Sequence, residues 1–147
     1  MTAAIEYLSA VLIYSGQPAQ LAKFYRDDLG FPLTDEQHGE TEPHYGCELG
    51  DVHFAIHPTS GAAPEPGRVR LAFVVFDMKE FVARIKGAGV ELLYEPKDVG
   101  FAIMTAIEDP DGNHIEFTQL SQRWYDHLQR RREAGHDLLL AKQARQI

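Results

Sequence analysis

LSAVLIYSGQPAQLAKFYRDDLGF, residues 8–31, predicts a buried strand followed directly by an amphipathic helix. Its first seven residues are an apolar, β-branched run of the kind found in buried strands. Gly16 ends this run, and apolar side chains then recur at helical spacing between Pro18 and Gly30. A proline at the start and a glycine just past the end are typical of a helix. Short strand signals follow, at 31–34, 44–49 and 52–57.

The same order of elements returns in the second half of the chain. Residues 58–67, PTSGAAPEPG, lack periodicity and indicate a linker. An offset of about 60 residues places Ala10 on Arg70 and His53 on His114, which indicates one repeated unit. Chance likeness between two strand–helix–strand stretches is the alternative. The signals of the second half are a strand at 69–76, a helix at 78–90, and strands at 91–95, 101–107 and 114–119.

Composition and charge indicate one acidic, globular domain. The chain has 147 residues, 44% of them hydrophobic and 24% charged, with a net charge of −8. This length is typical of a single domain. Residues 1–120 hold 8 Lys and Arg against 19 Asp and Glu, whereas residues 121–147 hold 6 against 3. An acidic body repels phosphate backbones, so we expect no nucleic-acid partner.

The sequence also indicates a cytoplasmic location. Its one cysteine, Cys47, excludes an internal disulfide and fits a reducing compartment. The first residues lack the basic segment of a secretory signal and include Glu6 within the apolar stretch. The longest apolar run, at 71–76, is too short to cross a bilayer, so we expect no membrane partner.

Two stretches, FYRDDLGF at 24–31 and DPDGNHIEF at 109–117, are the basis of a family resemblance. With the strands and helices around them, they make residues 7–119 similar to the vicinal oxygen chelate superfamily. That superfamily includes glyoxalase I, extradiol dioxygenases, fosfomycin-resistance enzymes and bleomycin-resistance proteins. The resemblance implies an α+β fold, in which two tandem βαβββ modules curve their mixed sheets into an open cup, often completed in a homodimer.

The resemblance also suggests how the chain is divided. We expect a single domain over residues 1–120, with modules at about 7–58 and 68–119 joined by the linker 58–67. Residues 121–147 lie outside the resemblance and have high helix propensity, so we expect a C-terminal helical extension. Three placements of this extension stay open: on the body, on a partner subunit, or as a partly ordered tail.

Metal-dependent members of the superfamily bind a divalent ion through one residue from the first and one from the last strand of each module. Carried over onto this sequence, the four positions are Ala10, Ala55, Arg70 and Glu116. Alanine has no donor atom and arginine is a permanent cation, so only Glu116 could ligate a metal. We therefore expect no metal at the usual position and no other cofactor.

Strand alternation predicts which side chains line the cup, because successive residues point to opposite faces. If the family's ligand positions define the inner face, polar residues fall on that face and the outer face is wholly apolar. The predicted ligand-binding residues are Tyr14, His53, His57, Arg70, His114 and Glu116.

These residues allow several roles. We expect Arg70 and Glu116 to meet as an ion pair that either holds a ligand or is a purely structural salt bridge. Glu116 and His114 are the candidate catalytic residues, as an acid–base pair. A relocated divalent metal held by Glu116, His114 and His53 is the alternative to a metal-free cup.

Two functions are compatible with the sequence. The first is a glyoxalase- or bleomycin-resistance-like protein that binds a small organic molecule in its cup without the family's usual metal. The alternative is an enzyme of the same superfamily, namely a lyase, isomerase or dioxygenase that uses Glu116 with a cup histidine or a relocated metal. The fold alone does not decide between them.

Overall fold

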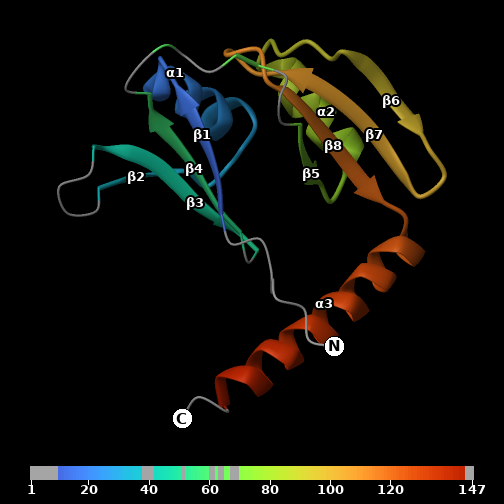
Figure 1. Ribbon diagram of the computed structural model, residues 1–147. Helices are drawn as coiled ribbons and strands as arrows, with labels where there is room; N and C mark the ends of the chain where they lie inside the picture. The colour runs from blue at the N-terminus through green and yellow to red at the C-terminus, as the bar shows by residue number, and fades with distance from the viewer. Residues whose placement is uncertain are drawn as a thin grey trace.

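The computed structural model describes residues 10–37, 42–50, 52–59, 62, 65–66 and 70–144, without the side chains of residues 132 and 135–144. These residues form two four-stranded mixed sheets with one helix each, and a long C-terminal helix (Figure 1). The predicted α+β fold of two βαβββ modules followed by a C-terminal helix is confirmed. Half of the predicted linker, residues 60, 61, 63, 64 and 67, lies outside the described residues.

The first module has the strand order β1-β4-β3-β2, with β1 parallel to β4 and the other neighbours antiparallel. Its helix α1 continues into a π-helical turn, η1, in which Leu29 N donates to Phe24 O. The elements are β1 (Ala10–Ser15), α1 (Pro18–Lys23), η1 (Phe24–Asp28), β2 (Thr34–Glu36), β3 (His44–Leu49) and β4 (Val52–Pro58).

The second module repeats this topology, with the strand order β5-β8-β7-β6 and β5 parallel to β8. The side chain of Asp77 accepts a hydrogen bond of 2.9 Å from Glu80 N and so caps the helix. The elements are β5 (Leu71–Val74), α2 (Met78–Gly87), β6 (Tyr94–Asp98), β7 (Ala102–Glu108) and β8 (His114–Leu120), and α3 (Gln122–Ala144) follows them.

Two predicted strands begin later than the sequence pattern indicated. The prediction of a strand at 31–34 was wrong, because Phe31 N donates to Tyr25 O and thus still belongs to the helix end. Pro32 has no N–H to donate to a ladder, and pairing starts only at Thr34. Likewise, Val90 N donates to Ile85 O, so β6 starts at Tyr94 and not at residue 91.

Aromatic rings from both modules share one core. Phe31 and Phe54 pack against Phe73 of β5, with ring centroids 4.9 and 5.8 Å apart. Tyr25 of η1 donates a buried hydrogen bond of 2.8 Å to Asp109 Oδ2, in the turn before β8. Burial and the Asp109 carboxylate both raise the pKa of Tyr25, because each disfavours the phenolate. The modules are therefore joined by ring packing and by a buried polar contact.

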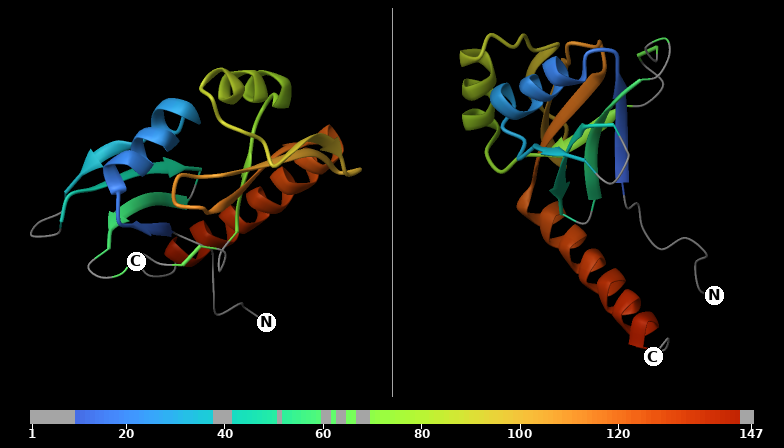
Figure 2. Two further views of the ribbon diagram at one scale, coloured as in Figure 1. Left: turned by 90° about the horizontal axis from the view of Figure 1, so that it is seen from above. Right: turned by 90° about the vertical axis from the view of Figure 1, so that its left-hand side faces the viewer.

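The arrangement of layers leaves one side of the molecule open. Figure 2 shows α1 and α2 on the same side of the two sheets, while α3 extends away from the body. No described helix covers the opposite sheet faces. None of the described helices is long and apolar enough to cross a membrane.

Candidate ligand-binding face

The predicted ligand-binding residues lie on the sheet faces that no described helix covers. On this side Leu12 and Tyr14 of β1 are 43% and 51% exposed, and Val74 of β5 is 58% exposed. Alternate residues, such as Phe54 and Phe117, are instead buried in the core. Strand alternation thus separates an apolar packing face from a partly polar open face.

In the second module, Arg70 and Glu116 form the ion pair expected from the sequence. Arg70 Nη1 lies 3.3 Å from Glu116 Oε1; the arginine side chain is 63% exposed and the glutamate 19%. His114 Nε2 lies 3.6 Å from the same oxygen, and it is buried without a hydrogen-bond partner among the described residues. Glu116 therefore stands between a permanent cation and an imidazole nitrogen.

Tyr94 of β6 adds a phenol to this part of the face. Its Cα pairs with Ala106, which in turn pairs with Glu116, so the three residues form one row across the sheet. The ammonium group of Lys97 lies 4.5 Å from the centroid of the Tyr94 ring. Burial and the charge of Glu116 raise the pKa of Tyr94, and Arg70 offsets part of this effect.

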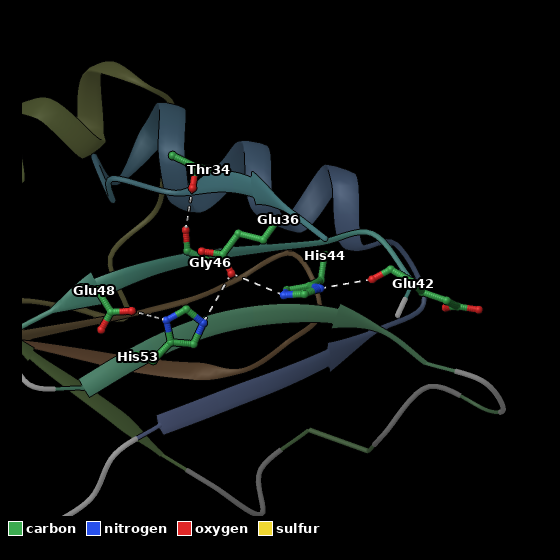
Figure 3. Close-up of polar contacts among 7 residues, drawn as sticks. All are labelled: Thr34, Glu36, Glu42, His44, Gly46, Glu48 and His53. Carbon is green, nitrogen blue, oxygen red and sulfur yellow. Dashed lines mark hydrogen bonds and ion pairs between the residues drawn. The ribbon is translucent and has the colours of Figure 1, made fainter. Parts of the chain in front are cut away.

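The first module contains a second carboxylate–imidazole cluster, which Figure 3 shows. Glu36 Oε2 of β2 lies 3.4 Å from His44 Nε2 and 3.5 Å from His53 Nε2. The other ring nitrogens are also held, since His44 Nδ1 is 3.1 Å from the carbonyl of Glu42 and His53 Nδ1 is 2.5 Å from Glu48 Oε1. The cluster runs from the exposed Glu48 to the buried His44, which is 4% exposed.

A glycine in the middle row of this sheet explains how Glu36 reaches His53. Leu12, Ala55, Gly46 and Thr34 pair across β1, β4, β3 and β2 in that order. The Glu36 side chain crosses above Gly46, where a methyl group would overlap its carboxylate. The missing side chain of Gly46 therefore leaves room for the Glu36 side chain to reach the centre of the sheet.

The number of protons in this cluster limits its chemistry. A neutral imidazole has one donor nitrogen, and a backbone carbonyl only accepts. Because His44 Nδ1 faces the carbonyl of Glu42, its Nε2 can attract Glu36 only if the ring or the carboxyl group holds a further proton. The same argument applies to His53 between Glu48 and Glu36. Both ring nitrogens of His44 and of His53 therefore face oxygen atoms of their neighbours.

His57 and Tyr14 are placed together at the other end of the face. The rings of His57 and His44 are stacked, with centroids 4.1 Å apart and planes at 13°. Tyr14 lies beyond them, 5.8 Å from His57 between ring centroids. The half-exposed Tyr14 ring is thus the outer edge of an aromatic row that a flat apolar ligand could extend.

The donors at the family's metal positions do not fit a divalent ion. Ala55 pairs with Leu12 as Glu116 pairs with Ala72, so Ala55 occupies the place equivalent to Glu116. Alanine offers no donor there, and the guanidinium of Arg70 opposes a cation beside Glu116. The described residues also contain no group of three His, Cys, Asp or Glu side chains that could hold a metal.

Two hollows in the described part of the chain lie away from this face. One hollow of about 460 Å³ lies between the start of α2 and strands β6 and β7. Another, of about 490 Å³, lies between η1 and the residues before β6. Neither is lined by a predicted ligand-binding residue.

The sequence did not reveal Glu36, His44 and Glu48 as part of the site. Alternation along the predicted strand 44–49 would have placed His44 and Glu48 on the same face as Gly46, which is a usable signal. Glu36 gave no such signal, because the predicted strand ended at residue 34 and the contact with His53 crosses the intervening strand β3. The predicted set brought together Arg70, His114 and Glu116, and separately Tyr14 and His57.

Comparison with known proteins agrees with this architecture. Residues 7–117 match the family described as Glyoxalase/Bleomycin resistance protein/Dioxygenase superfamily. The chain belongs to this superfamily. No curated protein matches the chain in sequence.

Several solved structures share the fold. TnmS3, an antibiotic binding protein from Streptomyces sp. CB03234, is 24% identical, with a TM-score of 0.68, and the match covers 82% of this chain and 100% of that one. A glyoxalase/bleomycin resistance protein from the same source is 23% identical, with a TM-score of 0.64 over 77% and 100%. Virulence protein STM3117 from Salmonella typhimurium is 21% identical, with a TM-score of 0.65 over 81% and 100%.

Proposed function

We propose that this protein binds a small organic molecule on its open sheet faces without the metal that is usual in the family. The main support is the contact between Arg70 and Glu116, because a guanidinium lies 3.3 Å from the one donor left at the family's metal positions. A fixed positive charge there neutralises Glu116 and can also hold a carbonyl or anionic group of a ligand. That an antibiotic binding protein shares the fold agrees with this role.

The rest of the face suits recognition of a ligand that is partly flat and partly polar. Leu12, Tyr14 and Val74 offer exposed apolar surface, which is what most ligand sites use for affinity. Arg70, His53 and His114 add polar groups at its border, which would fix the ligand's orientation. We further propose that the protein works in the cytoplasm as a homodimer, without nucleic-acid or membrane partners.

A thermal-shift screen with a library of small organic molecules tests the binding function. A ligand present at a hundredfold excess over its Kd stabilises the folded state by about 2.7 kcal/mol, which such a screen detects easily. The screen should be combined with elemental analysis of protein purified without chelators or a His tag. A stoichiometric transition metal that is lost in Glu116→Ala would overturn the proposal.

An enzymatic function is the second candidate, and the contact between His114 and Glu116 favours it. Nε2 of the histidine lies 3.6 Å from the carboxylate, so the two could act as an acid–base pair in a lyase or isomerase. Turnover of a compound found by the screen, lost in both His114→Gln and Glu116→Gln, would support the enzyme. Binding without turnover would support the simple binding protein.

A further inference from the structure

Helix α3 (Gln122–Ala144) is an addition to the family fold. The family match ends at residue 117, and the related structures are covered along their whole length without accounting for all of this chain. The start of α3 is held by the body, since Ser121 N donates to Phe101 O and the rings of Phe101 and Trp124 lie 5.9 Å apart. Beyond this point the helix extends away from both sheets (Figures 1 and 2).

A helix in this position needs a partner for its stability. Most helical stability in proteins comes from packing an apolar side against another element and not from propensity alone. Trp124 and Tyr125 are 41% and 39% exposed, although aromatic rings of this size usually find cover. At about 34 Å, the helix is long enough to cross a whole sheet.

The charge of α3 favours a second copy of this chain as that partner. Residues 121–147 hold 6 Lys and Arg against 3 Asp and Glu, whereas residues 1–120 hold 8 against 19. Arg130 and Arg131 are both exposed on the helix, two turns beyond Trp124. A basic arm on an acidic body is complementary to another molecule of the same kind.

The open face of the first module is the surface that fits this arm. Leu12 and Tyr14 leave apolar area exposed there, and Glu48, 69% exposed, lies on the same face. The corresponding face of the second module is a poorer match, because Arg70 and the Lys97 ammonium over the Tyr94 ring would repel arginines. Apolar surface beside the exposed carboxylate of Glu48 matches Trp124, Leu128 and the arginines that follow them.

We propose that α3 of one copy lies across strands β1, β4 and β3 of a second copy, and that the second copy returns the same contact. Trp124 and Leu128 then lie against the Leu12 end of this face, Arg130 and Arg131 come near Glu48, and Tyr14 stays open to a ligand. This goes beyond the binding function and rests only on the proposed homodimer. Each ligand face then gains a wall from the other subunit.

Sedimentation velocity of the full chain tests this arrangement. We expect a dimer whose dissociation constant rises by about a hundredfold or more in the double variant Arg130→Glu/Arg131→Glu, because like charges would then face each other. Arg123→Glu is the matched control, since it reverses a charge at the base of the same helix, beside its own body. A wild-type chain that stays monomeric, or a double variant that dimerises like wild type, would overturn the proposal.

A charge exchange between two variants identifies the contact itself. Glu48→Arg alone should weaken the dimer, as the arginine reversal does. When the two variants are mixed, opposite charges meet at both contacts, so heterodimers should form preferentially over either homodimer. Failure of the mixture to associate would contradict the arm-on-face contact. Ligand binding is measured separately in the thermal-shift screen. A negative result for the α3 contact therefore leaves the proposed binding function untouched.

Discussion

The carboxylate of Glu36 lies 3.5 Å from His53 Nε2, almost the same separation that Glu116 has from His114 Nε2 in the other module, 3.6 Å. His53 and His114 occupy equivalent positions on the last strands of the two modules. Glu116 stands on the same strand as its histidine, whereas Glu36 reaches across from β2. Both modules therefore present a histidine–carboxylate pair, although only one keeps the carboxylate at the family's position.

The first prediction concerns the space above Gly46. We expect Gly46→Ala to push the Glu36 carboxylate aside and to lower the free energy of unfolding by about 1–2 kcal/mol, through loss of its contacts with His44 and His53. Urea unfolding measures the loss, and the NMR signals of the His53 ring should shift at the same time.

Two controls separate this effect from a general cost of adding a methyl group. At Gly87 a methyl group would meet no atom within 4 Å, so Gly87→Ala should be neutral or stabilising by up to about 1 kcal/mol. In Glu36→Ala the methyl group at position 46 should add little further cost. If Gly46→Ala lowers the free energy of unfolding equally in the wild-type chain and in Glu36→Ala, the proposed overlap is contradicted.

The second prediction concerns Arg70. Its side chain is 63% exposed, so Arg70→Met should leave the free energy of unfolding within about 1 kcal/mol of wild type. The same change should abolish the thermal stabilisation given by a ligand from the screen. Lys79→Met, on the exposed start of α2, removes a positive charge elsewhere and should keep ligand binding. Normal binding by Arg70→Met would rule out its ligand role.

The third prediction concerns the buried link between the modules. Asp109 accepts hydrogen bonds from Tyr25 Oη and from Asp111 N, Asn113 N and Asn113 Nδ2. Tyr25→Phe removes only the first, and we expect a loss of about 1–3 kcal/mol in urea unfolding because a buried carboxylate loses a donor. Tyr125→Phe, at an exposed position, is the control and should change little. A neutral Tyr25→Phe would show that the link adds no stability.

The fourth prediction concerns stability at alkaline pH. Burial raises the pKa of Cys47 to about 11, and the charges of Glu48 and Glu36 add to this effect. An unfolded thiol titrates near about 8.5, so above that pH the unfolded chain loses a proton that the folded chain keeps. Stability should therefore be full below about pH 8.5 and should fall by up to about 1.4 kcal/mol per pH unit as the pH approaches 11.

Urea unfolding at several pH values measures this slope, and Cys47→Ala should make it shallower. The raised pKa of Tyr25 acts in the same direction and adds to the loss above about pH 10. An unchanged slope in Cys47→Ala would show that the thiol is not responsible.

The repeat and its strand alternation made most of the fold predictable from the sequence. Apolar positions such as Phe54 and Phe117 alternate with polar ones, so the buried and open faces could be assigned before the strands were paired. The ion pair between Arg70 and Glu116 was predicted from the family resemblance, which places their two strands side by side, as β5 and β8 are. Local periodicity and the repeat are therefore sufficient to predict the order of the elements and the buried face of each strand.

The remainder depends on contacts that local patterns do not encode. The bond from Phe31 N to Tyr25 O delays β2, and this delay brings Glu36 onto the face. Its reach to His53 on β4 depends on the missing side chain of Gly46 on β3, the strand that lies between β2 and β4. Such a diagonal contact is visible only after the register of three strands is known.

The Glu36 side chain extends from the outer strand β2 to His53, so its length sets the distance between the carboxylate and the imidazole ring. Glu36→Asp would shorten this side chain by one methylene group without altering β1 or β4. The carboxylate would then lie farther from His53, in the first module only. The pair formed by Glu116 and His114 stays unaltered in the same molecule and serves as an internal standard. A protein engineer could therefore change one histidine–carboxylate contact and compare it with the unchanged contact in the other module.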